Sequence, residues 1–467
     1  MSGQRLTVPE PEIELYQDGF EVKEGGVSDL GRASDGEKLS DLVEKIKEPM
    51  VIAVDAPWGA GKSVFLKCWV GEHIKEKHGN EATTVYFDAF KNDFMGDPLV
   101  SIFKEVSDRI ESLKPKTANE AEQQRIAKLK ALSNKAKKYA PILGRAALRL
   151  AVGTVATEAI MDIENPDEST LDEMLENAGS EAAKAIGSFW QAEETRTQAM
   201  DGFRTYLTDL AAEQKLAIVV DELDRCRPDY ALNLLEVIKH FFNVPNVHFV
   251  LGVNLTELEN SVRARYGAGV NAGLYLQKFV TVTMRLSNAR ITSAGSRSYV
   301  DYFGNVAEKL GLPSNFLRYQ ARAYLEHMGS NTDISLRNIE HFVRLLIISP
   351  WAIDLDYDWR THQNLKETIR IGLLLMKAVA PELISKVSSG TIQFSEINHF
   401  FNLPDPRDAT RSGEQISISW RICYFETMTM DFWHEYLQEN IHILNEYGAQ
   451  TPIQILKDYV EVFEWDA

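Results

Sequence analysis

Short apolar runs bounded by turn residues alternate with segments of helical periodicity through the first 290 or so residues of the chain. Five of these runs predict buried strands: Met50–Ala56, Thr83–Phe90, Leu216–Leu223, Val247–Asn254 and Phe279–Leu286. Between them, helical spacing predicts helices such as Ser63–Lys75 and Pro228–Phe242. Strands that alternate with helices favour an α/β fold, with a mostly parallel sheet sandwiched between two helical layers.

The same pattern divides the chain into three parts. Residues 1–38 are rich in Gly, Glu and Asp and show little periodicity, so we expect a loose N-terminal arm. Residues 39–286 contain the strands and a long helical insertion at about 98–213. Residues 287–467 show helix-like segments without a strong strand, which predicts an all-helical domain that acts as a lid or binds a partner.

Composition narrows the function classes. The net charge of −18 argues against a surface built throughout to bind nucleic acid or anionic lipid. The three cysteines lie far apart without a CxxC pair, which is typical of reduced thiols. The chain has neither a signal-like apolar N-terminus nor a run of 18 uncharged apolar residues. We therefore expect a cytoplasmic protein without stable membrane insertion.

A phosphate-binding motif follows the first predicted strand. The segment APWGAGKS, Ala56–Ser63, matches the P-loop pattern with Ala in place of the first Gly. Small residues let backbone N–H groups curl around phosphate oxygens, Lys62 supplies a cation for the β- and γ-phosphates, and Ser63 supplies a hydroxyl ligand for Mg²⁺. The predicted nucleotide contacts are Pro57, Trp58, Gly59, Ala60, Gly61, Lys62, Ser63 and Val64. We expect the Trp58 ring to wedge against the core, with stacking on a ligand as the alternative.

Two acids end the third predicted strand, in LAIVVDELDR. Asp221 is placed to hold Mg²⁺ or its water shell, and Glu222 to act as the general base that polarises an attacking water. Asn254 ends the next strand, where a polar side chain senses the γ-phosphate and orients the water, or simply caps the strand. The chain lacks the NKxD motif of GTPases, which favours ATP as the nucleotide.

These motifs resemble the KAP family of P-loop NTPases. The similar segments are Trp58–Ser63, Phe87–Asp93, Val219–Pro228, Leu251–Asn254 and Tyr275–Phe279. The resemblance implies ATP hydrolysis, this fold and a long insertion, which carries membrane helices in many members but is polar and charged here. Bacterial relatives often belong to phage-defence systems, so the resemblance also implies that role.

Two arginines are candidates for contacting phosphate. Arg225 follows the acidic pair and either reaches a phosphate or forms an ion pair with Asp224. Arg337 lies in Ser335–Arg344, which resembles the Arg-bearing helix of the family and would then close over the nucleotide. The alternative for Arg337 is a solvated charge on a helix.

Three functions compete at this point. The first is an ATP-driven switch that regulates a protein partner, and the others are a nucleic-acid motor and a nucleotide-binding scaffold without turnover. Glu222 argues against the scaffold, and the acidic net charge argues against the motor. We expect the active form to be an oligomer in which a neighbour supplies an arginine.

A basic segment, Arg125–Arg149, contrasts with the acidic chain. It contains eight basic residues and no acid: Arg125, Lys128, Lys130, Lys135, Lys137, Lys138, Arg145 and Arg149. The favoured interpretation is a helix face that docks on the acidic stretch Asp162–Glu181. The alternative is a patch that binds nucleic acid or an anionic membrane surface.

Overall fold

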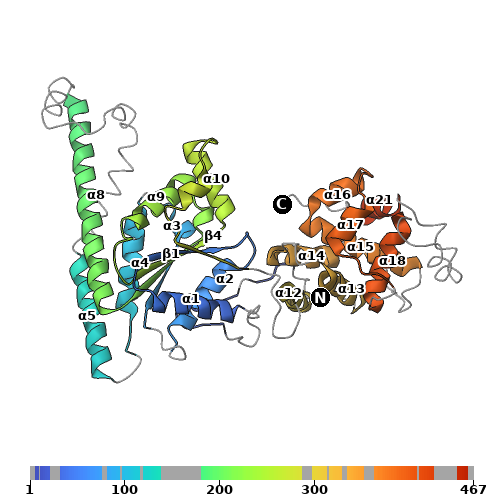
Figure 1. Cartoon of the computed structure of the whole chain (residues 1–467), viewed down its shortest axis with the longest axis horizontal. Helices are drawn as coiled ribbons and strands as arrows, with labels where there is room; N and C mark the ends of the chain where they lie inside the picture. Colours follow the sequence, from blue (N-terminus) through green and yellow to red (C-terminus); the bar gives the residue numbers. More distant parts are fainter. Residues whose placement is uncertain are drawn as a thin grey trace.

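A five-stranded sheet lies at the centre of the N-terminal half of the chain (Figure 1). Its strands are β1 (Met50–Asp55), β2 (Thr83–Asp88), β3 (Leu216–Asp221), β4 (Val247–Val253) and β5 (Val282–Arg285), in the order β2-β3-β4-β1-β5. The computed structural model describes residues 6–9, 11–20, 32–75, 81–94, 97–115, 119–137, 180–286, 297–312, 315–328, 334–351, 362–406, 410–424 and 450–460.

Every strand pairs in parallel with its neighbour, which confirms the predicted parallel sheet. Asp55 lies beside Val253, and Asp88 lies beside Asp221, so the strands end together at one edge. Each strand ends one to two residues earlier than predicted, because the chain turns out of the sheet at this edge. Strand β5 is shorter than predicted also at its start, since it borders the sheet and, of the described strands, pairs with β1 alone.

Helices cover both faces of the sheet. They are α1 (Ala33–Lys45), α2 (Lys62–His73), α3 (Ala89–Asn92), α4 (Pro98–Ser112), α5 (Glu120–Ala136), α8 (Ser180–Glu213), the 3₁₀ turn η4 (Leu223–Arg225), α9 (Pro228–Lys239), α10 (Leu255–Tyr266) and α11 (Ala272–Leu276). Alternate strand residues point to opposite faces. Ile52 and Val54 therefore pack with α1 and α2, whereas Val51 and Ala53 share the other core with α4, α8 and α9. The result is the predicted three-layer sandwich.

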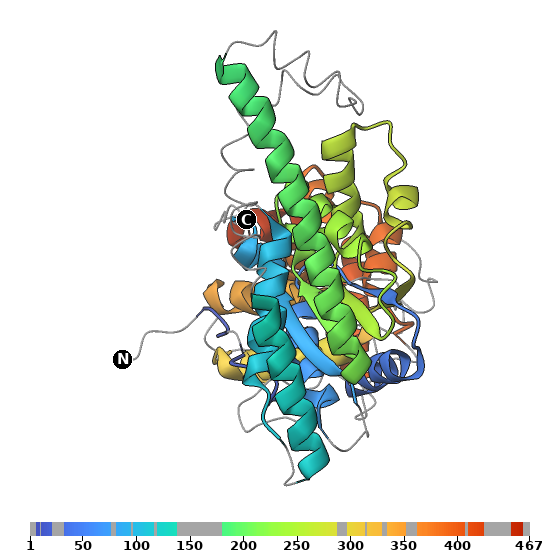
Figure 2. The same cartoon turned by 90° about the vertical axis from the view of Figure 1, so that its left-hand side faces the viewer.

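The insertion between β2 and β3 contains α4 and a pair of long helices. Helices α5 and α8 lie side by side along one flank of the molecule, and α8 extends well beyond the sheet (Figure 2). Two residues of the predicted basic segment have acidic partners here, because Lys128 pairs with Glu213 and Lys137 lies 2.6 Å from Glu111. Residues 138–149, and the acidic stretch expected to receive them as far as residue 179, lie outside the described residues. No described helix combines the length and apolar character that crossing a membrane requires.

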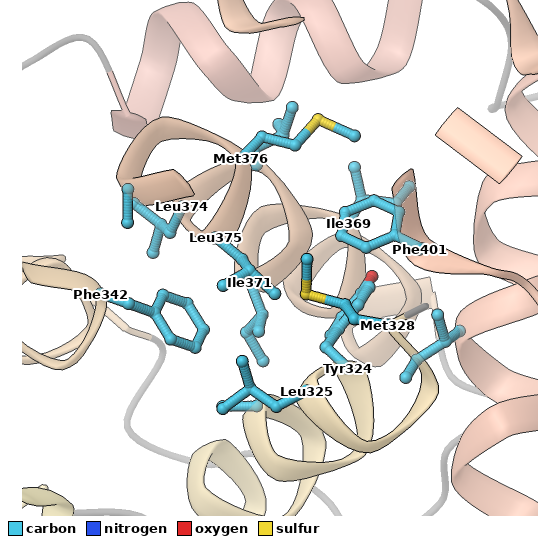
Figure 3. Packing of buried hydrophobic residues seen from close by; sticks show 14 of the residues in the cluster. Tyr324, Leu325, Met328, Phe342, Ile369, Ile371, Leu374, Leu375, Met376 and Phe401 are labelled. Atoms are coloured by element: carbon cyan, nitrogen blue, oxygen red, sulfur yellow. The ribbon is translucent and has the colours of Figure 1, made fainter. Parts of the chain in front are cut away.

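The C-terminal part of the chain is helical, as predicted. Its elements are α12 (Ser298–Lys309), α13 (Asn315–His327), α14 (Leu336–Ile348), α15 (His362–Val379), α16 (Pro381–Ser388), α17 (Phe394–Phe401), α18 (Arg411–Tyr424), α21 (Gln450–Ile455) and the π-helical turn η5 (Leu456–Val460). They surround a separate hydrophobic core, in which Tyr324, Phe342 and Phe401 pack around the nearly apolar centre of α15 (Figure 3). Trp420 is buried in this core.

The N-terminal arm differs from the expectation of a loose segment wherever it is described. The Tyr16 hydroxyl accepts a hydrogen bond from the backbone N–H of Tyr86 (2.9 Å), and the Arg109 guanidinium lies 3.7 Å from the centre of the Tyr16 ring. Further towards the N-terminus, the carbonyl of Leu6 accepts a hydrogen bond from Arg344 of α14. The arm thus covers the free edge of β2 and reaches the C-terminal helices. The sequence did not reveal this because single aromatic anchors in irregular backbone have no period.

Candidate functional site

The loop between β1 and α2 has the backbone geometry of a phosphate cradle. Gly59 (φ 80°) and Gly61 (φ 78°) adopt left-handed conformations that side chains rarely tolerate. A Cβ on Gly59 would lie 2.6 Å from the Cβ of Arg337, so glycine is also required there for space. Ala60 between them is fully buried. Helix α2 begins at Lys62, and its first N–H groups and partial positive charge therefore face the loop.

Lys62 lies in the site as an almost buried cation. Its side chain is 8% exposed, and its Nζ lies 3.5 Å from Oδ2 of Asp224 and 3.3 Å from the carbonyl oxygen of Ala56. The same Asp224 oxygen accepts a hydrogen bond from the indole N–H of Trp58 at 2.5 Å. The prediction that Trp58 wedges against the core is wrong. The ring is 44% exposed because its polar N–H is held by Asp224 at the rim of the site.

Asp221 ends β3 as a fully buried carboxylate. It accepts hydrogen bonds from the Tyr86 hydroxyl (2.7 Å) and from the backbone N–H of Glu222 (2.8 Å). Burial raises the pKa of Asp221, although these hydrogen bonds and nearby Lys62 oppose the shift. A Cβ on Gly252 of β4 would lie 2.4 Å from the Asp221 carboxylate, which explains the glycine in the LGVN segment.

Glu222 is held in an unusual backbone conformation. Its φ of 58° lies in the left-handed region, which is uncommon for a residue other than glycine. Its Oε1 accepts from the Ser63 hydroxyl at 3.3 Å and lies 2.9 Å from the Arg225 guanidinium. Burial raises the pKa of Glu222, the neighbouring Arg225 opposes the shift, and Asp221 and Asp88 add to it. Such strain combined with a raised pKa is typical of functional carboxylates.

Arg225 and Asn254, the other predicted polar residues, lie at the same edge of the sheet, where the strands end. Arg225 forms its ion pair with Glu222, so the predicted alternative of a pair with Asp224 is wrong. The i, i+3 spacing on the 3₁₀ turn brings Arg225 back over Glu222, while Asp224 points towards the P-loop. Asn254 begins α10, but its side chain makes no capping hydrogen bond.

The first turn of α14 docks on the phosphate loop. The backbone N–H groups of Leu336 and Arg337 both point at the carbonyl oxygen of Gly59, at 3.0 and 3.4 Å. Ser335 caps the helix in a reciprocal capping box with Asn338, which fixes this end. From the other side, Arg32 donates to the carbonyl oxygen of Ala60 at 2.7 Å. Arg337 is exposed beside the loop, where the family resemblance expects a nucleotide-contacting arginine.

The residues at this edge fit a hard cation. The Ser63 hydroxyl, Asp221 and Glu222 supply oxygen ligands of the kind that Mg²⁺ prefers. Burial raises the pKa of both carboxyl groups, and a cation bound beside them would favour their charged forms. The described residues contain no cluster of three or more His, Cys, Asp and Glu side chains that could hold a metal alone. An Mg²⁺ ion here would therefore share its ligands with phosphate oxygens and water.

The structure brings Lys62, Ser63, Asp221, Glu222 and Arg225 to one edge, as their motifs predict. Pro57, Trp58 and Val64 lie in or next to the same loop, and Asn254 lies at the end of the adjacent strand. Sequence reasoning missed the hydroxyl of Tyr86 and the inward carboxylate of Asp224. The register of β2 against β3 could have indicated Tyr86, but nothing in DELDR distinguishes the direction of Asp224 from that of Arg225.

The family comparison agrees with this geometry. A model described as the KAP family P-loop domain matches residues 34–349, which extends from α1 to the end of α14. No curated protein matches the chain. Among solved structures, the ORC2 protein of Aeropyrum pernix in its ADPNP and ADP complexes aligns at 10% identity with a TM-score of 0.31, covering 88% of this chain and 86% of that chain.

Proposed function

The chain belongs to the KAP family of P-loop NTPases, and we propose from this premise that it binds ATP with Mg²⁺ and hydrolyses it. The observation that carries the proposal is the contact of the Ser63 hydroxyl with Glu222 at 3.3 Å, at the end of the phosphate loop and next to Asp221. A metal-binding hydroxyl and two strand-end acids at one point are what phosphoryl transfer to water requires.

Each side chain then has a role that follows from its position. Lys62 neutralises the β- and γ-phosphates, and the loop N–H groups bind their oxygens. Ser63 and Asp221 would hold Mg²⁺, which would supply positive charge against the charge that develops on the phosphates. Glu222 accepts the proton of the attacking water, for which its raised pKa is suited. Asn254 and Arg225 are candidates for orienting that water and contacting the γ-phosphate.

We further propose that hydrolysis operates a conformational switch. Two backbone hydrogen bonds run from the first turn of α14 to Gly59, so the C-terminal helices contact the loop that phosphate would occupy. A change in the loop on binding or release of phosphate would alter these contacts and with them the orientation of the helical domain. Arg337 is placed on the moving side, next to the loop.

The proposed output of the switch is a protein partner or a second copy of the chain. Arg225 is paired with Glu222. An arginine supplied by a neighbour in an oligomer is therefore a second candidate, beside Arg225, for contacting the γ-phosphate. A role in bacterial anti-phage defence stays a prediction from the family resemblance.

Phosphate release measured with purified protein tests the proposal. We expect Mg²⁺-dependent turnover of ATP, and loss of it in Lys62→Ala. Lys45→Ala is the matched control, because Lys45 is exposed on α1 and pairs only with Asp41 in the described structure. Turnover that survives in Lys62→Ala at the level of Lys45→Ala would overturn the assignment. Addition of DNA or RNA, which should leave the rate unchanged, separates the switch from a nucleic-acid motor.

A further inference from the structure

Asp224 is a charged residue of the site for which the proposed chemistry has no role. It lies on η4, one turn beyond β3, and its side chain is 1% exposed. One of its oxygens, Oδ2, faces Lys62 and Trp58, and the other, Oδ1, has no hydrogen-bond partner among the described residues. A buried carboxylate with an unsatisfied oxygen is costly and calls for an explanation.

The ion pair with Lys62 explains why the carboxylate is tolerated. Both side chains are almost excluded from water, and each charge would be strongly destabilising there without the other. Trp58 adds a hydrogen bond that fixes the carboxylate on the side of the lysine. The pair therefore restrains the P-loop lysine within the protein.

The two neighbouring acids are compensated differently. Asp221 accepts from Tyr86, and Glu222 is matched by Arg225 and Ser63. Asp224 instead engages the cation that a nucleoside triphosphate requires. A triphosphate brought to Lys62 would compete with Asp224 for the lysine and would also place negative charge near a buried carboxylate, where like charges repel strongly.

We propose that Asp224 is an internal counter-anion that restrains Lys62 and thereby lowers the affinity for nucleoside triphosphate. The inference rests on the proposed function, since it assumes that Lys62 binds phosphate. Trp58 is a positioning residue in this arrangement, because its indole N–H holds the same Asp224 oxygen that faces the lysine. This restraint raises the nucleotide concentration that is needed to saturate the site.

Asp224→Asn is the informative variant, because the amide oxygen still accepts from Trp58 while the charge is lost. We expect about a tenfold lower Kd for Mg·ATP, and a lower melting temperature for the nucleotide-free protein, since Lys62 loses its counter-ion. A purely structural role for Asp224 would instead weaken binding. Asp229→Asn, the same change at an exposed position on α9, should leave both quantities unchanged. Should Asp224→Asn fail to fold, Asp224→Ser tests the same loss of charge.

A double-mutant cycle on the empty protein keeps the inference separate from the proposed function. Lys62→Met and Asp224→Asn should each lower the free energy of unfolding, and the double variant should lose less than their sum. Additive losses, or a Kd for Asp224→Asn within twofold of wild type or weaker, would overturn the restraint. Coupling without any binding of Mg·ATP by the wild type would instead refute the proposed function and, with it, the effect on affinity.

Discussion

At the amino-terminal edge of the sheet, backbone N–H groups and nearby basic side chains satisfy the carboxylate of Glu44. At the carboxyl-terminal edge, the carboxylates of Asp221, Glu222 and Asp224 are satisfied only in part. Glu44 accepts hydrogen bonds from the backbone N–H groups of Glu81 (2.9 Å) and Ala82 (2.8 Å) and lies 3.2 Å from the imidazole of His73. Burial alone would raise its pKa, but these partners lower the pKa of Glu44 to about 2. At the other edge, burial prevails and the pKa values of Asp221 and Glu222 are raised.

The difference separates a group that stabilises the fold from groups for which we propose a role in ligand binding. Glu44 joins α1 to the starts of β2 and β3, and its charge is balanced within the protein. The acids at the other edge carry charge that the protein balances only in part, which is favourable once a cation binds. Substitutions at the carboxyl-terminal edge should therefore impair nucleotide binding or hydrolysis. Substitution of Glu44 at the amino-terminal edge should instead lower stability.

Glu222→Gln should slow ATP hydrolysis by about a hundredfold or more while binding remains, because the amide positions water but cannot accept its proton. Single-turnover hydrolysis with excess enzyme measures the step. A rate within a few-fold of wild type would mean that another group is the base, and Asp224 would then be the first to examine.

The pH dependence sharpens the same assignment. As the proposed base, Glu222 would act only when deprotonated, and its pKa is raised. The rate of hydrolysis should therefore fall with decreasing pH at values above the ordinary glutamate pKa of 4.5. This fall in rate at low pH, the acid limb of the profile, should be absent from the residual activity of Glu222→Gln. An acid limb that persists unchanged in the variant would assign it to a different group.

Asp221→Ala should weaken Mg·ATP binding by about tenfold, while binding of ATP in the presence of EDTA changes little. Titration of a fluorescent ATP analogue with and without Mg²⁺ measures both quantities. Equal losses in the two conditions would show that Asp221 supports the fold of the loop and not the metal.

Glu44→Gln should lower the free energy of unfolding by about 1–3 kcal/mol, because a charged acceptor with several donors is lost. Urea denaturation at neutral pH measures it, and Glu48→Gln, an exposed position nearby, is the control. ATP turnover should be unchanged where both variants are folded. A loss of unfolding free energy no larger than that of Glu48→Gln would contradict the proposed contrast between the two edges of the sheet.

The depressed pKa of Glu44 fixes the sign of its pH effect. Its contribution to stability is fully present above the unfolded pKa of about 4.5 and is lost as the pH falls through about 2. Wild type should therefore lose more stability than Glu44→Gln over this range. A parallel loss in both proteins would contradict the assignment.

The smallest effect is expected for charge-reversing substitutions in the basic segment Arg125–Arg149. Lys128 and Lys137 already have acidic partners in the structure, which favours internal pairing over a polyanion patch. Wild type should then show no binding to DNA, RNA or anionic vesicles at about 50 mM salt. Binding that is abolished by reversing Lys135, Lys137 and Lys138 to Glu would establish the patch. Basal hydrolysis should be intact in that triple variant.

The sheet and the motifs at its edge could be predicted because each has a local signature. Continuous apolar runs mark buried parallel strands, and Gly59, Gly61 and Lys62 are required by the chemistry of phosphate binding itself. The contact of Lys62 with Asp224 and that of Asp221 with Tyr86 were missed, because each joins segments that lie far apart in the sequence. The docking of the N-terminal arm through Tyr16 was missed for the same reason.

We infer that the Mg²⁺ ion of Mg·ATP would balance the carboxylates of Asp221 and Glu222 at the carboxyl-terminal edge. Thermal unfolding of wild type and Lys62→Ala with increasing Mg·ATP measures this balance without relying on turnover. We predict that saturating ligand raises the melting temperature of wild type by about 5 °C or more and leaves that of Lys62→Ala unchanged. An equal shift in both proteins, or none in wild type, would contradict the inference.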